Sequence, residues 1–157
     1  MSRIYPRNIY LLTTLSVSAA LFLPFFTAFD HIFGIISAIV ATALLSVAII
    51  IYAKFTSFDL TSKAFYIFCV GSAVAFFGIS VTLFCCFMPI DPSVSRVWNI
   101  IVSLVFVVIH SVYLAYHTQL ILGGRAYQIT EDDWVFGAVT IFTNILGIFL
   151  SMLGLRR

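Results

Sequence analysis

Three side chains in the last two apolar stretches of the sequence have the chemistry to handle protons or cations: His110, His117 and Asn144. An unperturbed imidazole titrates at about pH 6.5, so it changes charge near physiological pH. An amide stays neutral and offers one acceptor oxygen and one NH2 donor. Polar and ionisable side chains inside membrane spans are costly and tend to mark transport or relay sites. We therefore treat these three residues as candidates for a pore lining or a pH sensor.

The same two stretches carry stripes of polar, aromatic and small residues at helical spacing. Steps of three and four residues place side chains on one helix face. The first stripe consists of Asn99, Ser103, Phe106, His110, Tyr113 and His117, and the second of Gly137, Thr140, Asn144, Gly147, Ser151 and Gly154. We expect the two stripes to meet, with Asn99, Ser103, Thr140, Gly147 and Ser151 forming a helix interface around the candidate site. The alternative is that His110, His117 and Asn144 only hydrogen-bond across helices and hold them together.

The composition indicates a membrane protein. Of 157 residues, 62% are hydrophobic and 9% are charged, and eight Lys and Arg against six Asp and Glu give a net charge of +2. A soluble domain is about one quarter charged. Disorder requires low hydrophobicity and high charge, and a nucleic-acid binder shows a basic face. The composition therefore argues against an ordinary soluble domain, a disordered chain and a nucleic-acid-binding protein.

The positions of the charges divide the chain into five uncharged stretches. These lie at about residues 8–29, 32–53, 64–88, 97–122 and 134–155. About 20 apolar residues cross a bilayer as a helix, and helices satisfy their own backbone groups in lipid. No linker, repeat or low-complexity segment interrupts the sequence. We therefore predict an all-α integral membrane protein, with residues 1–157 forming a single transmembrane domain that contacts the lipid bilayer through a bundle of five helices.

The first apolar stretch has a second interpretation. Two basic residues precede it, and Ser18-Ala19-Ala20 is a small-residue segment of the kind found at signal-peptide cleavage sites. The apolar run continues through residues 21–26, past that segment, which favours a retained helix.

Two signals mark helix ends later in the sequence. Gly123-Gly124 is typical of the end of a helix, and we expect Thr130 to cap the start of the last helix.

The distribution of basic residues predicts the orientation in the membrane. Basic residues collect on the cytosolic side of membrane proteins. With five spans, one side holds Arg3, Arg7, Lys54, Lys63 and Arg125, whereas the other holds Arg96, Arg156 and Arg157. This difference favours a cytosolic amino terminus and a carboxyl terminus on the opposite side.

The sequence has no pattern that favours an enzyme. His110 and His117 are seven residues apart, His31 is remote from both, and no acidic residue falls within an apolar stretch. A hydrolytic metal centre needs a closer cluster of histidines and carboxylates. Nucleophile-elbow and phosphate-loop motifs are also missing. We therefore expect neither catalysis nor a cofactor or structural metal.

Four segments together resemble the Bax inhibitor-1 family, also called the lifeguard or transmembrane Bax inhibitor motif family. YPRNIYLL at residues 5–12 is similar to the family's His-Pro-x-Asn helix start, and KFTSFDLTSKAF at residues 54–65 to its Gln-Thr-Lys-x-Asp-Phe-Thr loop. YLAYHTQLILGG at residues 113–124 and ITEDDWVFGAV at residues 129–139 resemble its Asp-Thr-Gln, Gly-Gly and final-helix signature. The segments occur in the family's order, and they resemble the lifeguard branch most closely.

The resemblance carries expectations about architecture and location. The family has seven transmembrane helices, and this sequence corresponds to the last five. The first two helices are then either supplied by another chain or missing because the chain is a shortened product. The family also implies an endoplasmic reticulum or Golgi membrane, a role in suppressing cell death and control of calcium leak.

The sequence departs from the family at the calcium-related site. The resemblance implies an Asp on each of the last two helices, which together form a proton-sensitive pair, but here these positions hold His117 and Asn144. Calcium prefers several oxygen ligands that include carboxylates. We therefore expect calcium ions to be conducted weakly or with an altered pH response. The alternative is a non-conducting scaffold that binds other membrane proteins, including full-length relatives.

Overall fold

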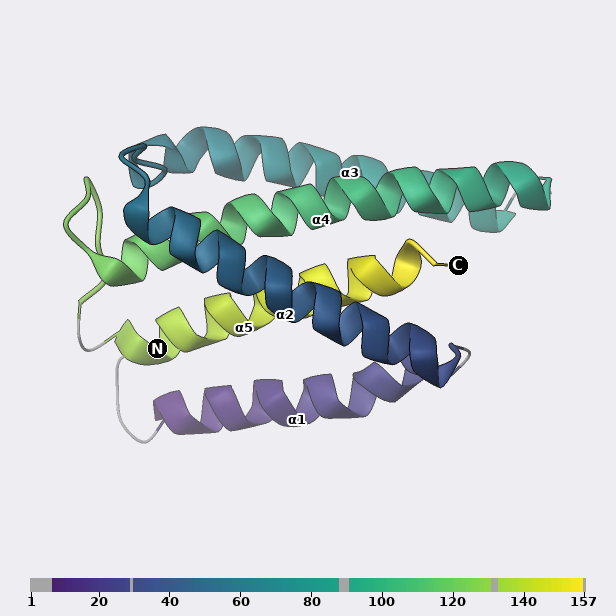
Figure 1. Ribbon diagram of the computed structural model, residues 1–157, viewed down its shortest axis with the longest axis horizontal. Helices are drawn as coiled ribbons and strands as arrows, with labels where there is room; N and C mark the ends of the chain where they lie inside the picture. Colours follow the sequence, from purple (N-terminus) through teal and green to yellow (C-terminus); the bar gives the residue numbers. More distant parts are fainter. Residues whose placement is uncertain (1–6, 29, 88–90, 131–132, 157) are drawn as a thin grey trace.

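The computed structural model is all-helical over the residues that it describes, which are 7–28, 30–87, 91–130 and 133–156, without the side chains of residues 7, 8, 85 and 86. The helices are α1 (Arg7–Thr27), α2 (Ile32–Phe55), the short 3-10 helix η1 (Thr61–Lys63), α3 (Ala64–Phe87), α4 (Pro92–Leu122) and α5 (Trp134–Gly154) (Figure 1). Five of them are long and apolar enough to cross a membrane. The predicted class, a helical membrane bundle with five spans, is confirmed.

Local sequence signals set the ends of α4. The helix begins at Pro92, five residues before the expected start at residue 97, because the Asp91 carboxylate accepts hydrogen bonds from Ser93 N at 2.9 Å and Ser93 Oγ at 2.6 Å. Proline is favoured in the first turn, where its missing N–H has no helical partner. The helix ends at Leu122 because Gly123 and Gly124 both have a φ of 71°, in the left-handed region.

The start of α5 differs from the prediction. The residue that precedes the helix is Asp133, and Thr130 Oγ1 donates to the Asp133 carboxylate at 2.9 Å. The expectation that Thr130 caps α5 is therefore wrong, because its hydroxyl is used by the neighbouring carboxylate. Residues 131 and 132, part of the acidic run, lie outside the described residues.

Helix α5 lies at the centre of the bundle. It contacts α4 over the largest interface, and it also contacts α2, which crosses both helices obliquely, and α1 (Figure 1). Helix α3 packs chiefly on α4. The α2–α3 and α4–α5 connections lie at one end of the bundle, whereas the α1–α2 turn and the carboxyl terminus lie at the other (Figure 1). The core is therefore the trio α2, α4 and α5, flanked by α1 and α3.

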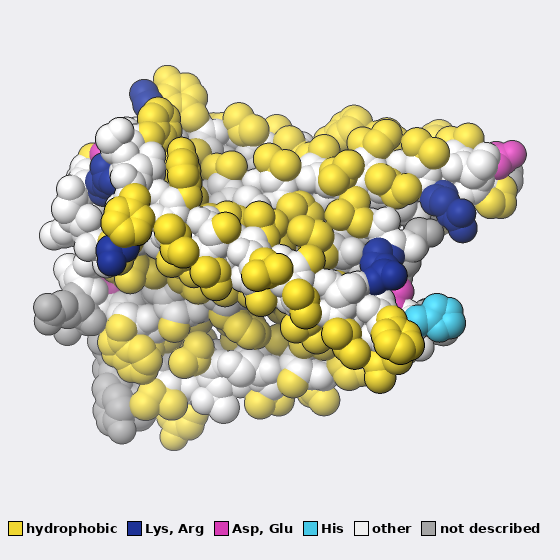
Figure 2. Space-filling view, viewed as in Figure 1, with side chains coloured by type: hydrophobic (Ala, Val, Ile, Leu, Met, Phe, Trp, Pro, Cys, Tyr) yellow, Lys and Arg dark blue, Asp and Glu magenta, His cyan; other side chains and the backbone are white. Residues whose placement is uncertain are grey.

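The outer surface is apolar along the length of the bundle. Phe25, Phe33 and Phe87 are 77%, 81% and 84% exposed, and charged side chains gather at the two ends (Figure 2). Soluble monomers rarely expose contiguous apolar surface of this extent. The exposed faces therefore contact lipid, and the charged ends lie near the membrane surfaces.

Glycines allow α4 to approach its two neighbours closely. A Cβ at Gly78 of α3 would lie 2.9 Å from Phe106 Cε2, and Gly71 of α3 lies directly beneath the Tyr113 ring. On the other side, Gly147 of α5 lies beneath the His110 ring, and Gly154 lies against Ser103 Oγ. The stripe predicted on α4 therefore divides between two partners. Phe106 and Tyr113 face α3, whereas Ser103, His110 and His117 face α5, because each of these two sets repeats every seven residues on its own side of the helix.

We predict that Gly147→Ala destabilises the bundle. The new Cβ would lie 2.6 Å from His110 Nδ1, so the ring would have to move. Overpacking a fitted contact typically costs about 1–3 kcal/mol, against an intrinsic helix gain of at most about 1 kcal/mol. Thermal unfolding in detergent should show a lower Tm for this variant.

Gly34→Ala is the matched control for that prediction. A Cβ at Gly34 would lie 3.7 Å from Arg156 Nη1, which is an ordinary contact distance. We expect its Tm to equal or slightly exceed that of the wild type. Equal losses in the two variants would contradict a specific role for the contact between His110 and Gly147.

Candidate functional site

His117 of α4 and Asn144 of α5 meet directly across the central interface. Asn144 Nδ2 lies 3.0 Å from His117 Nδ1 and donates to Thr140 O at 2.8 Å. Asn144 is 6% exposed, and His117 is partly buried. Their closeness follows from the seven-residue repeat that directs His110 and His117 toward α5. Two residues chosen from the sequence as one site are therefore in contact.

A single proton determines which hydrogen bonds His117 makes. Its Nδ1 also lies 2.8 Å from Tyr113 O. Nδ1 can donate to that carbonyl only when it carries a hydrogen, whereas it can accept from the Asn144 NH2 only when it does not. When both ring nitrogens are protonated, Asn144 must turn its amide to present oxygen to the ring. The contact therefore has two hydrogen-bond arrangements, one with Nδ1 as donor to Tyr113 O and one with Nδ1 as acceptor from Asn144. The neutral ring can adopt either arrangement as one of its two tautomers, whereas the imidazolium adopts only the first.

His110 lies in the same interface between α4 and α5, but its Nδ1 takes no part in the contact between His117 and Asn144. The atom is buried and has no hydrogen-bond partner in the structure. The ring lies against Gly147 and is 6.2 Å from the Phe106 ring, centroid to centroid. His110 therefore fills the space between α4 and α5 below His117.

The predicted interface residues differ in what they contact. Ser103 lies against Gly154, and Gly147 accommodates His110, so both form part of the interface between α4 and α5. Thr140 and Ser151 donate to carbonyls of their own helix, Thr140 to Phe136 and Gly137 and Ser151 to Gly147. Asn99 is exposed, because α4 at that level has passed the end of α5.

A second polar cluster, which sequence reasoning did not identify, joins the two connections at one end of the bundle. Its centre is Gln119 of α4, which is 1% exposed. Gln119 Nε2 donates to Phe58 O at 2.9 Å and to Ala53 O at 3.3 Å, and its Oε1 accepts from Leu60 N at 2.8 Å. One side chain thus fixes the α2–α3 connection to α4.

Asp59 and Arg125 complete this cluster, which we call the loop clamp (Asp59, Thr61, Gln119, Arg125 and Ala126). The Asp59 carboxylate accepts from Thr61 Oγ1 at 2.6 Å and from Ala126 N at 3.2 Å. Arg125 donates to the carbonyls of Thr56 and Ser57. The two connections are therefore held together across the end of the bundle that lies above His117.

A sequence signal for the loop clamp existed. Asp59 and Gln119 both lie in the segments that carry the family resemblance, and a Gln near the end of an apolar stretch is costly to bury without partners. The hydrogen-bond partners of Gln119 are 59–66 residues away in the sequence, so residue spacing alone does not identify them.

The site offers few ligands for a cation. Among the described residues, no group of three or more His, Cys, Asp or Glu side chains is placed to hold a metal ion. His117 and Asn144 together provide one imidazole and one amide. A calcium ion needs several oxygen ligands. The contact is thus better suited to exchanging a proton than to holding a divalent cation.

Comparison with known proteins agrees with the resemblance in the sequence. A family model described as inhibitor of apoptosis-promoting Bax1 matches residues 1–155. The chain is 29% identical over 155 residues to Protein lifeguard 3 of Homo sapiens and 29% identical over 155 residues to Protein lifeguard 3 of Mus musculus. Each alignment covers 98% of this chain and 48% of the relative, so the chain spans about half the length of these curated relatives. No solved structure gives a significant match.

We predict that Gln119→Leu destabilises the protein even though it preserves side-chain size. The substitution leaves Leu60 N and the carbonyls of Ala53 and Phe58 without their partner. Each buried unsatisfied group costs about 1–3 kcal/mol, so the expected loss is on the order of 2 kcal/mol or more. Thermal unfolding in detergent, which compares the Tm of Gln119→Leu with that of the wild type, measures this loss of stability.

Thr118→Val provides the matched control at the neighbouring buried position. Thr118 Oγ1 donates only within its own helix, to Leu114 O at 2.7 Å. Its Tm should change little. A Tm for Gln119→Leu that matches that of Thr118→Val would show that the loop clamp contributes little stability.

We also predict that acid weakens the loop clamp through Asp59. The hydrogen bond from the Thr61 side chain, with backbone donors, lowers the pKa of Asp59 below its ordinary value of 3.8. A carboxyl with a lowered folded-state pKa stabilises the fold above the ordinary value, and this stabilisation is lost as the pH falls through the lowered pKa. The difference in Tm between the wild type and Asp59→Asn should therefore be constant near neutral pH and shrink below about pH 4. A difference that does not change with pH would exclude this role.

Proposed function

Because the chain belongs to the Bax inhibitor-1 family of multi-pass membrane proteins, we propose that it regulates calcium leak across an endoplasmic reticulum or Golgi membrane and thereby cell death. In this proposal, His117 and Asn144 replace the acidic pair of the family, so calcium passes weakly or with an altered pH response. The observation that carries the proposal is the 3.0 Å contact between the two side chains. Residues at the positions of the acidic pair meet in the bundle interior, but they bring no negative charge there.

The packing around the contact supports weak conduction. The His110 ring lies against Gly147, and the His117 ring lies 6.4 Å from the Phe136 ring and 5.0 Å from the Tyr116 ring, centroid to centroid. A calcium ion that leaves water needs oxygen ligands to replace its hydration shell. Aromatic rings and one amide do not replace it. The interface between α4 and α5 is thus a poor calcium path.

The contact can still respond to pH. His117 with an unprotonated Nδ1 accepts from Asn144, whereas the neutral Nδ1–H tautomer and the imidazolium both donate to Tyr113 O, and only the imidazolium carries a positive charge. That charge repels calcium, so calcium flux should fall on acidification. An acidic pair behaves differently, because two close carboxylates share a proton and repel each other when both ionise.

A second candidate function is that of a non-conducting partner of other membrane proteins. The neutral contact between His117 and Asn144 favours it, because hydrogen bonds of this type hold membrane helices together without a pore. Its partners would include full-length relatives. Calcium flux and co-purification distinguish the two functions.

We predict that restoring both acids raises calcium flux. The purified chain is reconstituted in liposomes that contain a calcium dye, and the rate of entry is measured from pH 6 to pH 8 for the wild type and for His117→Asp with Asn144→Asp. The wild type should be slow at every pH. The double variant should be faster by on the order of tenfold, equivalent to about 1.4 kcal/mol of ion stabilisation, with a different pH profile.

Asn99→Asp is the matched control, since it adds an acid to α4 at an exposed position outside the interface. It should leave the flux unchanged. Fast flux in the wild type that disappears in both His117→Ala and Asn144→Ala would overturn the proposed loss of conduction. No gain in the double variant, together with co-purification of a relative, would favour the non-conducting function.

A further inference from the structure

Arg156, two residues beyond the end of α5, holds the first turns of α2. Its Nη1 donates to Gly34 O at 3.4 Å and also to Ser37 Oγ. The Arg156 side chain is exposed, and the carboxyl terminus lies at the same end of the bundle as the α1–α2 turn (Figure 1). These three residues, which we call the α2 latch, tie the end of α5 to the beginning of α2.

The two ends of α2 are held unequally. At the carboxyl end of α2, Gln119 is 1% exposed and makes three hydrogen bonds, to Ala53 O, Phe58 O and Leu60 N. Breaking them leaves unsatisfied groups inside the bundle, whereas the exposed Arg156 exchanges its partners for water at little net cost. Local opening of a protein begins where the fewest buried contacts must be broken. Helix α2 should therefore release at the α2 latch and stay fixed at the loop clamp.

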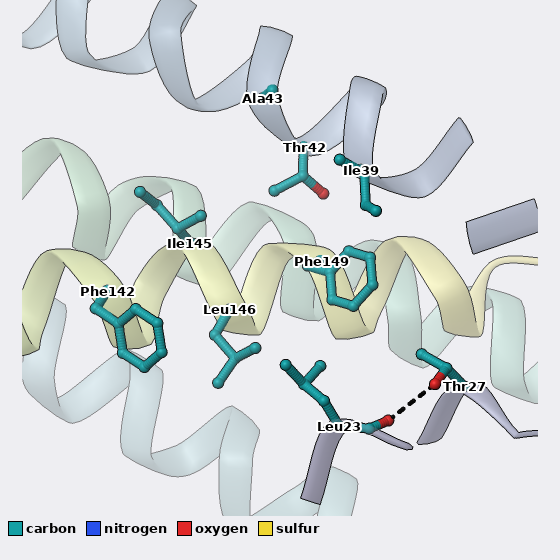
Figure 3. Close-up of a pocket in the computed structure, with 9 residues that line it drawn as sticks. All are labelled: Leu23, Thr27, Ile39, Thr42, Ala43, Phe142, Ile145, Leu146 and Phe149. Atoms are coloured by element: carbon teal, nitrogen blue, oxygen red, sulfur yellow. Dashed lines mark hydrogen bonds between the residues drawn. The ribbon is translucent and has the colours of Figure 1, made fainter. Parts of the chain in front are cut away.

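The face of α2 that covers the core consists of small residues. Gly34, Ala38, Thr42 and Ser46 follow one another at every fourth position, and all four are buried. The Thr42 side chain points from α2 toward α5 (Figure 3). The Oγ atoms of Thr42 and Ser46 are buried, and neither has a hydrogen-bond partner among the described residues. Buried hydroxyls without partners are unfavourable, and water that enters between the helices supplies partners. The closed packing of α2 therefore carries a cost that hydration removes.

Helix α2 has room to move on the side of α1. An apolar groove of about 450 Å³ lies between α1, α2 and α5, and its lining includes Leu23, Ile39 and Phe149 (Figure 3). Helix α2 makes its large interfaces with α4 and α5 and not with α1. A movement of α2 over this groove therefore separates few contacts between α2 and α1.

An opening along the buried face of α2 leads to His110. Leu45, next to Ser46, lines one groove with Val108 and Ser111 of α4, which lie on either side of His110 in the sequence. Ser46 and His110 are therefore at the same level of the bundle. The Nδ1 atom of His110 is also buried without a hydrogen-bond partner in the described part of the chain. A third unpartnered polar atom thus lies at this level of the core.

We propose that α2 is a gate that pivots on the loop clamp and, when the α2 latch releases, admits water to the hydroxyls of Thr42 and Ser46. Release gives up the contacts of Arg156 and the packing of small side chains, and it gains hydration of the unpartnered polar atoms. The latched form is the one in the structure. The water reaches the level of His110, so the gate gives solvent access to the interior from the end opposite the loop clamp. The movement of α2 does not depend on whether calcium passes.

The test is the reaction of single cysteines on the buried face of α2 with a water-soluble methanethiosulfonate reagent, in the full chain in phosphatidylcholine nanodiscs. The native cysteines are first replaced by alanine: Cys69, Cys85 and Cys86. The reporters are Ser46→Cys and, near the loop clamp, Ala53→Cys. Arg156→Ala should raise the reaction rate at Ser46→Cys about fivefold, the factor expected for the loss of one weak exposed contact. The rate at Ala53→Cys, a position that is 1% exposed, should stay as low as in the latched protein.

Arg96→Ala is the matched control, because it removes one positive charge at the same end of the bundle and leaves the α2 latch in place. It should leave both rates unchanged. Arg156→Lys keeps the charge without the guanidinium fork, so it should give a smaller rise at Ser46→Cys, and it carries the test if Arg156→Ala does not fold. Equal rates at Ser46→Cys with and without the α2 latch would overturn the proposal. An equal rise at Ala53→Cys, or the same rise in Arg96→Ala, would also overturn it.

The role of the two hydroxyls is tested with a third reporter, Ala38→Cys, at a buried position closer to the α2 latch. In the presence of Arg156→Ala, the double variant Thr42→Val with Ser46→Ala removes the gain from hydration. It should therefore lower the reaction rate at Ala38→Cys severalfold. An unchanged rate would show that hydration of these hydroxyls does not drive the gate.

Discussion

The close approach of α4 to α5 is the contact on which the rest of the bundle depends. Lipid provides no hydrophobic drive between helices, so membrane helices associate through fitted surfaces and polar contacts. Gly147 and Gly154 remove side chains from α5 where His110 and Ser103 of α4 arrive. That fit brings His117 to Asn144, and it gives α2 a continuous surface of two helices to cross.

Much of the fold follows from the sequence because charged side chains are costly to place within the lipid bilayer. The few charged residues mark the ends of the apolar stretches, which is sufficient to count the helices. Helix α4 begins five residues before the predicted start, because Asp91 and Pro92 provide a helix start ahead of the charged Arg96. The sequence also does not predict that the α4 stripe divides between α3 and α5. Periodicity shows which residues share a helix face, but it does not show how many neighbours that face contacts.

The candidate site was only partly accessible to sequence reasoning. His117 and Asn144 could be paired because each stands at a position where the family resemblance implies an acid, and they do meet. The sequence does not predict the role of Gln119, because its hydrogen-bond partners belong to a connection about 60 residues earlier in the chain. The burial of the Gln119 amide becomes understandable only when the structure places the backbone groups of Phe58 and Leu60 beside it. Polar groups in this bundle thus lie at two levels, as the contact between His117 and Asn144 in the interior and as the loop clamp at one end.

The unequal lengths of the helices relate the bundle to the thickness of its membrane. Helix α4 has 31 residues, about 46 Å of helix, whereas α5 has 21 residues, about 31 Å. A hydrocarbon layer of about 30 Å matches α5 but leaves the first turns of α4 in the headgroup region, where Asn99 is exposed. Mismatch of this kind costs fractions of a kcal/mol per Å and is relieved by tilt. A thicker bilayer draws more of α4 inward and changes its tilt against α5, so hydrophobic matching acts on the same interface that holds His117 and Asn144.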